Sequence, residues 1–409
     1  RGSKLMGDQN LPSDKSRTFY IMMLFMVITG TLNTVFLKLQ NSAFERILNQ
    51  PFSHPWFQSI LMFIGEFYCA LLWLCLKGYF RRSEQLERER ALAQNPHMED
   101  VSLPDAPPWL FMISCGCDLI GSTLLNFALL NMAGSIFQML RGGIIIVTCV
   151  FMIIFLKKSP RNFEWLGVGF VFLGVFMVGL ASQIDPDNGS GDETNILGIL
   201  MLVFSLLFQG FQFIYQERIL IKYKCHPMQL VAWEGTWGLI AFLIILPIFE
   251  FIPCNFGGRE KVCSVNQDGE YFLEQTVFAF EQMVDKIPIL IYTIGQTFSI
   301  CGFNFFGIML VKYSSAATRS VMDSTRTVLV WVFFLLVPMA NGSTLEHFLW
   351  LQLAGFVVML FGQVVFNGIV KIPILGFDKH FKKTEDDALM DQNLLTKEGS
   401  VKNKSDYDA

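Results

Sequence analysis

Apolar stretches about as long as a bilayer is thick recur along the whole chain. The hydrocarbon core of a membrane is about 30 Å thick, so a helix needs about 20 apolar residues to cross it. Of the 409 residues, 52% are hydrophobic and 16% are charged, a balance outside the range of soluble domains. The sequence therefore predicts an all-α polytopic membrane protein with ten transmembrane helices. The ten predicted segments are 18–40, 56–78, 108–132, 135–156, 163–182, 196–216, 229–253, 287–311, 314–337 and 346–370.

The basic residues between these segments orient the chain in the membrane. Cytosolic loops of membrane proteins carry an excess of Lys and Arg. With the amino terminus in the cytosol, the basic clusters fall on the inner side, and the outer side holds only Arg46, Arg259, Lys261 and Lys286. We therefore expect both termini to be cytosolic.

Two further patterns agree with this orientation. Asn188 and Asn341 each begin the sequence Asn-Gly-Ser in an expected outer loop, which is a glycosylation sequon, although sequons also arise by chance. Cys254 and Cys263 share the longest outer loop. In an oxidising lumen they would form a disulfide, and the alternative is two unpaired thiols.

The two halves of the chain carry similar patterns of small residues. An offset of 182 residues aligns the sequence AGS at 133–135 with SAA at 315–317, and each opens a predicted helix. The next helix of each half has two glycines spaced by seven, which are Gly167 and Gly174 in the first half and Gly355 and Gly362 in the second. Because five is an odd number of helices, the halves must insert with opposite orientations. This predicts the inverted repeat of secondary transporters, with the substrate site near the midplane.

These predictions together give the organisation of the chain. It comprises a cytosolic amino-terminal tail (1–17), a first five-helix repeat (18–182) with a cytosolic loop (79–107), a lumenal loop (183–195), a second five-helix repeat (196–371) with a lumenal loop (254–286), and a disordered cytosolic tail (372–409).

Charged side chains inside the apolar segments are the main functional signal. A charge facing lipid costs at least about 2.5–3.5 kcal/mol, so intramembrane charges face the helix bundle or a wet cavity. Arg319, Asp323 and Arg326 have the spacing i, i+4, i+7, which places them on one helical face. Gln138 and Arg141 are spaced by three in segment 135–156, and the 182-residue offset places Arg141 opposite Asp323. We predict that these five line one cavity, whose guanidinium groups suit a carboxylate or phosphate. The alternative is that Asp323 only neutralises Arg141 or Arg326 in a closed network.

Three acidic residues also lie inside predicted helices. Glu66 and Glu234 each occur in the first third of the second helix of a half. If buried, they could exchange protons and couple transport to a proton gradient, and the alternative is a packing role in which a protonated Glu bonds a neighbouring carbonyl. The same two interpretations, proton exchange and a packing role, apply to Asp118.

No enzyme class fits the sequence. HExxH, GxSxG and GxxxxGK[ST] are absent, and the five histidines are dispersed, so neither a hydrolase nor a nucleotide site is indicated. We expect no enzymatic activity, no cofactor, no metal and no nucleic-acid partner.

Four segments resemble a known family. HPWFQSILMFIGEF (54–67), SIFQMLRGGIII (135–146), EWLGVGFVFLGVFMVGLA (164–181) and FNFFGIMLVKYSSAATRSVMDSTRTVLVW (303–331) are similar to the F subfamily of solute carrier family 35, in the drug/metabolite transporter superfamily. The resemblance covers all ten predicted helices. It implies two inverted five-helix repeats, transport by alternating access, and kinship with nucleotide-sugar and chloroquine-resistance-type transporters. It implies no particular substrate.

The same resemblance and the tail bear on location and role. Relatives are placed in lysosomal membranes and have also been linked to mitochondria. Asp391, Leu394 and Leu395, after acidic residues 385–387, resemble a DxxLL sorting signal. We therefore expect a lysosomal or late endosomal membrane, with mitochondrial or Golgi membranes as alternatives. The expected partners are the lipid bilayer, a small organic solute and sorting adaptors bound to the tail, with a homodimer left open.

The resulting hypothesis is a secondary transporter of an anionic or zwitterionic solute, in which Glu66 or Glu234 carries a proton. The predicted solute contacts are Gln138, Arg141, Asn304, Arg319, Asp323 and Arg326. A nucleotide-sugar-type exchanger and a non-transporting membrane scaffold or regulator are the alternatives.

Overall fold

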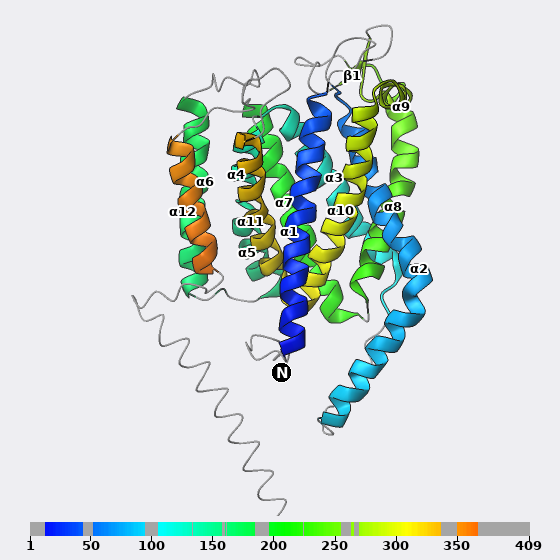
Figure 1. Ribbon diagram of the computed structural model, residues 1–409, viewed down its shortest axis with the longest axis vertical. Coiled ribbons are helices and arrows are strands. Elements are labelled where there is room, and N and C mark those ends of the chain that lie inside the picture. Colours follow the sequence, from blue (N-terminus) through cyan, green and yellow to red (C-terminus); the bar gives the residue numbers. More distant parts are fainter. Residues whose placement is uncertain are drawn as a thin grey trace, which may run out of the picture.

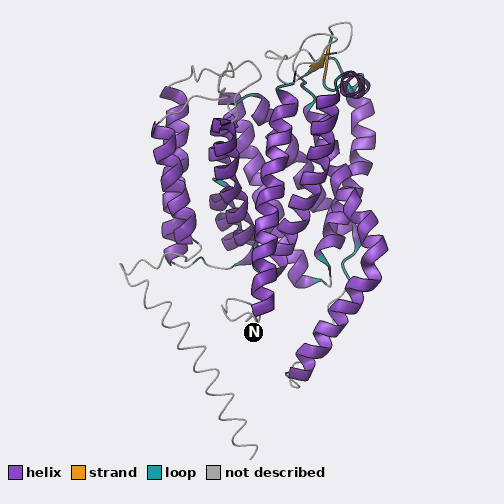
Figure 2. Cartoon of the chain, viewed as in Figure 1, coloured by secondary structure: helices purple, strands orange, loops and turns teal. Residues whose placement is uncertain are grey.

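Helices make up almost all of the chain that the computed structural model describes, as Figure 2 shows. The described residues are 13–43, 52–94, 105–132, 134–157, 160, 162–184, 196–223, 225–254, 263–265, 270–336 and 350–366. The longer helices run side by side in one bundle (Figure 1). Their bounds are α1 (Ser13–Asn41), α2 (Pro55–Gln94), α3 (Phe111–Leu130), α6 (Asn162–Ile184), α7 (Ile196–Lys222), α8 (Pro227–Phe249), α10 (Ile287–Tyr313), α11 (Ala316–Leu336) and α12 (Trp350–Phe366).

Eight helical segments of the described chain are long and apolar enough to cross a membrane. They are Thr18–Asn41, Pro55–Tyr79, Pro108–Leu130, Ile136–Leu156, Asn162–Leu180, Ile196–Lys222, Pro227–Phe249 and Ile287–Tyr313. The remaining two predicted segments correspond to α11, whose first half carries three charges, and to α12, which has 17 described residues. The chain is therefore a polytopic membrane protein, as predicted.

The predicted helix at 135–156 is interrupted. It is divided into α4 (Gly134–Arg141), α5 (Ile144–Phe151) and a π-helical turn at Met152–Leu156. The backbone N–H groups of Gly142 and Gly143 donate hydrogen bonds to the carbonyls three residues earlier, those of Met139 and Leu140, at 3.1 and 3.0 Å. In a regular α-helix each would bond to the carbonyl four residues earlier. The Ser324 hydroxyl of α11 donates to the carbonyl of Gly142 at 3.3 Å. Glycines permit such a break, and a side chain that satisfies the freed carbonyl makes it tolerable inside a membrane.

Two predicted loops contain regular structure. The charged part of 79–107 continues α2 as far as Gln94, beyond the ends of the other helices (Figure 1). The outer loop 254–286 contains an antiparallel pair of short strands, β1 (Ser264–Val265) and β2 (Tyr271–Phe272), and then α9 (Thr276–Asp285). Cys254 and Cys263 form a disulfide in this loop, with their Cα atoms 6.1 Å apart.

The two helices that carry the repeated glycines lie side by side (Figure 1). A Cβ atom added to Gly174 of α6 would lie 2.5 Å from the carbonyl oxygen of Gly355 in α12, and one added to Gly167 would lie 2.8 Å from that of Gly362. The backbones therefore touch directly at both pairs. Such close approach is the usual role of small residues where helices pack in lipid. We call this contact the glycine seam.

Candidate functional site

Arg141 is positioned by the break between α4 and α5. It is the last residue of α4, directly before the two glycines, and its side chain turns into the bundle, where it is 7% exposed. Its Nη2 atom lies 3.6 Å from Oδ2 of Asp323 on α11. The structure thus brings together the two residues that the 182-residue offset had placed opposite each other.

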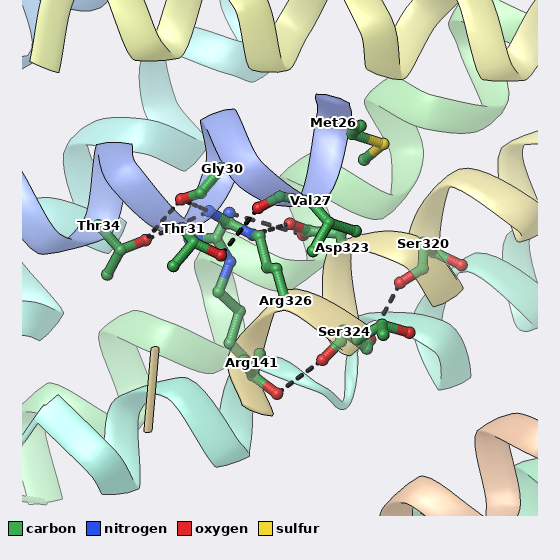
Figure 3. Close-up of polar contacts among 12 residues, drawn as sticks. Met26, Val27, Gly30, Thr31, Thr34, Arg141, Ser320, Asp323, Ser324 and Arg326 are labelled. Atoms are coloured by element: carbon green, nitrogen blue, oxygen red, sulfur yellow. Dashed lines mark hydrogen bonds and ion pairs between the residues drawn. The ribbon is translucent and has the colours of Figure 1, made fainter. Parts of the chain in front are cut away.

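Asp323 lies between two arginines, as Figure 3 shows. Its Oδ1 accepts a hydrogen bond from Nε of Arg326 at 2.5 Å, while its Oδ2 faces Arg141. Asp323 and Arg326 are each 1% exposed. One carboxylate therefore stands against two guanidinium groups in a region closed to solvent. We call Arg141, Asp323 and Arg326 the charge triad.

Helix α1 covers the far side of Arg326. Nη1 of Arg326 donates to the carbonyl of Gly30 at 2.6 Å and to the hydroxyl of Thr34 at 3.2 Å. Its guanidinium lies 4.5 Å from the ring centre of Phe303, a cation–π contact. A Cβ atom on Gly30 would lie 2.7 Å from the side chain of Arg326. Arg326 is therefore enclosed between α1, α10 and α11.

Arg319 faces a different set of partners. Its Nη1 donates to Oε1 of Gln216 on α7 at 2.6 Å, and its guanidinium stacks 4.1 Å from the ring centre of Phe213. Nε2 of Gln216 donates in turn to Oε1 of Glu234 at 2.8 Å. Glu234 also accepts a hydrogen bond from the hydroxyl of Ser114. Gln216 thus bridges the arginine and the glutamate.

The second predicted glutamate has an equivalent setting. Glu66 on α2 is fully buried and accepts a hydrogen bond from the amide of Asn304 on α10. Asp118 lies within electrostatic reach of both Glu66 and Glu234, and Arg319 lies within reach of all three acids. Three buried carboxyl groups therefore share one nearby guanidinium.

A cavity of about 60 Å³ lies between these two clusters, which is room for a few water molecules. Its charged lining consists of Asp118, Arg141 and Arg319. The rest of its polar lining is mostly amide: Gln58, Asn126, Gln209, Gln212, Gln296 and Asn304. Oε1 of Gln209 and of Gln296 is buried without a hydrogen-bond partner among the described residues. Buried polar atoms of this kind are ordinarily satisfied by water or by a ligand.

The residues predicted to line one cavity therefore fall into two groups. Arg141, Arg319 and Asn304 line the cavity, whereas Gln138, Asp323 and Arg326 are buried outside its lining. The five polar residues of α4 and α11 therefore do not line one cavity in this conformation, and their role as solute contacts stays a prediction. The separation is caused by α1, which packs over Arg326 at Gly30 and closes that part of the face.

Sequence reasoning missed Gln216 and left Asp118 undecided. Gln216 follows Gln209 and Gln212 at i+7 and i+4 in α7, so the three share one face, and this spacing was a usable signal. Several other predicted sites cannot be placed in this way. Asn188, Asn341, Asp391, Leu394 and Leu395 lie outside the described residues.

Comparisons with known proteins agree with this architecture. A family model described as CRT-like, chloroquine-resistance transporter-like, matches residues 94–366. Solute carrier family 35 member F6 of Mus musculus is 31% identical over 358 residues, covering 86% of this chain and 89% of that protein. The Homo sapiens protein of the same name is 31% identical over 357 residues, with the same coverage. The nucleotide sugar transporter SLC35B4 of Mus musculus is 27% identical over 134 residues, or 30% of this chain and 40% of that protein.

Proposed function

Because the chain belongs to the CRT-like family of chloroquine-resistance transporter-like proteins, we propose that it is a secondary active transporter of a small organic solute. The family resemblance predicted from the sequence is confirmed, and the two member F6 relatives that each cover 86% of the chain are solute carriers rather than enzymes. The solute is anionic or zwitterionic, and it moves by alternating access to the central cavity.

The observation that carries this proposal is the lining of that cavity. The guanidinium groups of Arg141 and Arg319 and the carboxyl group of Asp118 meet there among six amides. Guanidinium binds carboxylate or phosphate with directional hydrogen bonds, and amides add both donors and acceptors. At about 60 Å³ the cavity is too small for an organic solute, since ligand pockets usually measure about 300–1,000 Å³. This conformation is therefore a closed one, and transport requires the bundle to open on each side in turn.

Ten membrane helices in two inverted halves provide the mechanism for this opening. The helix contacts support the arrangement because they occur in matching sets. If α1–α6 and α7–α12 are equivalent halves, α1 packing on α10 corresponds to α7 packing on α3, and both contacts exist. Likewise α2 packs on α10 as α8 packs on α3, while α6 and α12 pack on each other. The second membrane helix of each half, α2 and α8, also carries a fully buried glutamate, Glu66 and Glu234.

Proton coupling follows from the balance of buried charge. Glu66, Asp118 and Glu234 lie within electrostatic reach of Arg319, and excess charge inside a membrane protein is costly. Together with the charge triad, four carboxyl groups face three guanidinium groups, so one bound proton would balance this buried charge. We propose that Glu66 or Glu234 releases its proton when the cavity opens to water, which would couple solute movement to a proton gradient.

The membrane that houses the transporter is proposed from sequence signals. The dileucine-type signal at Asp391, Leu394 and Leu395 and the sequons at Asn188 and Asn341 favour an endolysosomal membrane with both termini cytosolic. A glycosidase-sensitive gel shift that disappears in Asn188→Gln plus Asn341→Gln supports this topology. Asn403 begins a third sequon, Asn-Lys-Ser, in the tail that is expected to be cytosolic, so glycosylation at Asn403 would contradict this topology.

Uptake into proteoliposomes tests the transport proposal. The panel should contain organic acids, phosphates, amino acids and nucleotide sugars, each with and without a pH gradient. Arg319→Gln should lower uptake of the transported solute by about tenfold or more, because a charge-assisted hydrogen bond is worth about 1.5–3 kcal/mol. Arg218→Gln is the matched control, because Arg218 is an exposed arginine of α7, and it should leave uptake unchanged.

The same assay separates the alternatives. Strict exchange of nucleotide sugars would favour the nucleotide-sugar exchanger, in line with the partial match to SLC35B4. If no solute is moved and none raises thermal stability, the carrier proposal fails, and the closed charge triad would then favour a scaffold.

A further inference from the structure

A second cavity lies at the edge of the bundle, beneath α9. It has a volume of about 270 Å³ and is enclosed by α2, α8, α9 and α10. Its walls are almost wholly hydrocarbon, with Ile60, Ile64, Leu246, Phe280 and Leu290 among the residues that form them. A cavity of this composition stays free of water and accepts apolar ligands.

The cavity is short enough to lie within one leaflet of a bilayer. Its walls come from the first turns of α2 and α10 and from the last turns of α8. On α2 it reaches from Phe57 to Ile64, which is about 11 Å along the helix axis. Half of a hydrocarbon core is about 15 Å, so the cavity has room for part of one lipid acyl chain.

Helix α9 covers the end of this cavity. It lies across the end of the bundle and is seen end-on in Figure 1. A ring contact between Phe280 and Phe57 of α2, with centres 5.1 Å apart, and a 3.1 Å hydrogen bond between Gln282 and His54, the residue before α2, hold it in place. Val277 is 59% exposed, and Phe280 and Val284, which also line the cavity, are 55% and 78% exposed. A short helix with an exposed apolar side that lies across a bundle end is typical of the membrane interface, so the cavity adjoins lipid.

Among the described residues that line the cavity, the polar side chains are two threonine hydroxyl groups, those of Thr276 and Thr293. Thr293 is satisfied, because its Oγ1 donates to the carbonyl of Ile289 at 2.8 Å and accepts from Nε2 of Gln40 at 2.7 Å. Oγ1 of Thr276 is buried and has no hydrogen-bond partner among the described residues. An unpaired buried hydroxyl is costly, so an acceptor on a ligand would stabilise it.

We propose that this cavity binds one acyl chain of a membrane glycerolipid from the leaflet on the α9 side. The chain lies between α2 and α10, and its ester carbonyl accepts the hydrogen bond of Thr276. The surrounding lipid, the hydrocarbon walls, a depth that lies within one leaflet and the unpaired hydroxyl at the α9 end all fit this occupant. The site is separate from the central cavity and does not depend on which solute that cavity takes.

Photolabelling tests the proposal. The full chain is reconstituted in phosphatidylcholine vesicles with a trace of phosphatidylcholine that carries a diazirine on its acyl chain, irradiated and mapped by peptide mass spectrometry. Label should concentrate on the segments 52–64 and 275–293. Ile64→Trp fills the cavity and should lower this labelling by about tenfold, because an acyl chain that entered beside the indole ring would overpack the site at a cost of about 1–3 kcal/mol. Thr276→Val should lower it by about threefold to tenfold, the value of one hydrogen bond.

The control is Ile294→Trp, since Ile294 is 49% exposed and outside the cavity lining, and it should not change the labelling. Elution volume and helical circular dichroism identify any variant that misfolds. A test without mutation uses wild-type protein in vesicles of methyl-branched phosphatidylcholine. The branched acyl chains should not fit into the cavity, so they should not compete with the straight-chain photolabel for it. Label spread evenly over all exposed apolar surfaces, or unaffected by Ile64→Trp, would show ordinary bilayer contact only and overturn the proposal. Displacement by a sterol but not by straight-chain phospholipid would overturn the choice of occupant.

Discussion

Replacing Asp323 by Asn isolates the contribution of the charge triad to stability. Asparagine has nearly the same volume, so the packing of α11 is kept while the negative charge is lost. The Arg326 contact of 2.5 Å and the Arg141 contact of 3.6 Å would both lose their anion. Two guanidinium groups would then remain buried side by side without a counter-charge.

The expected cost is large because both arginines are shielded from water. Removing one partner of a buried ion pair destabilises by about 3–5 kcal/mol. Partners are easier to find in the unfolded state within a membrane mimic, so we expect a value near the lower limit, about 3 kcal/mol. Arg326→Met with Asp323→Asn removes one of the two unpaired charges. The double variant should therefore be more stable than the sum of the single effects by about 2 kcal/mol.

The assay is equilibrium unfolding of the purified protein in mixed micelles with a rising fraction of sodium dodecyl sulfate, followed by tryptophan fluorescence. The four proteins of the mutant cycle are measured together. Asp285→Asn is the control for loss of a carboxylate, because Asp285 is exposed at the end of α9, and it should change stability by less than about 0.5 kcal/mol. If the effects of Asp323→Asn and Arg326→Met simply add, the two residues are not coupled and the reasoning about the triad is refuted.

Three other changes test further parts of the structure. Gly174→Leu should destabilise by about 1–3 kcal/mol or more in the same assay, because its Cβ would lie 2.5 Å from a carbonyl oxygen of α12, whereas Gly169→Leu, with open space around it, should be neutral. Gln216→Leu removes the bridge between an arginine and a glutamate. It should cost about 1–3 kcal/mol and raise the Km for solute uptake, and an unchanged Km would contradict a role in the site. Cys254→Ser should cost about 2–3 kcal/mol and abolish any effect of reductant on stability, while Cys75→Ser, a free exposed thiol, should do neither.

Structural features that follow from a repeating sequence pattern could be predicted. The apolar stretches identified the spans, and the glycine spacing identified two helices that do pack together. The juxtaposition of Arg141 and Asp323 agrees with the 182-residue offset, which aligned these two positions although they are distant in the chain. In each case a repeated pattern in the sequence was sufficient.

Features that depend on a third element could not be predicted. The enclosure of Arg326 is produced by α1, whose Gly30 and Thr34 carry no sign of their partner in sequence. Helix α9, with 10 residues, is too short to cross a membrane, and hydropathy predicts only a loop there. The break at Gly142 and Gly143 had a signal in the paired glycines, but apolar residues on both sides concealed it, since hydropathy does not distinguish a continuous helix from an interrupted one.

The glycine seam has a consequence for how the chain could be assembled from parts. In the sequence, α6 comes before the connection between 184 and 196 and α12 comes after it. The backbones of the two helices meet without intervening side chains. The halves therefore recognise each other through surfaces rather than through the peptide that joins them. A gene severed in that connection should yield two separately inserted fragments that find each other in the bilayer and are recovered as one complex, and a leucine at Gly174 should leave them apart.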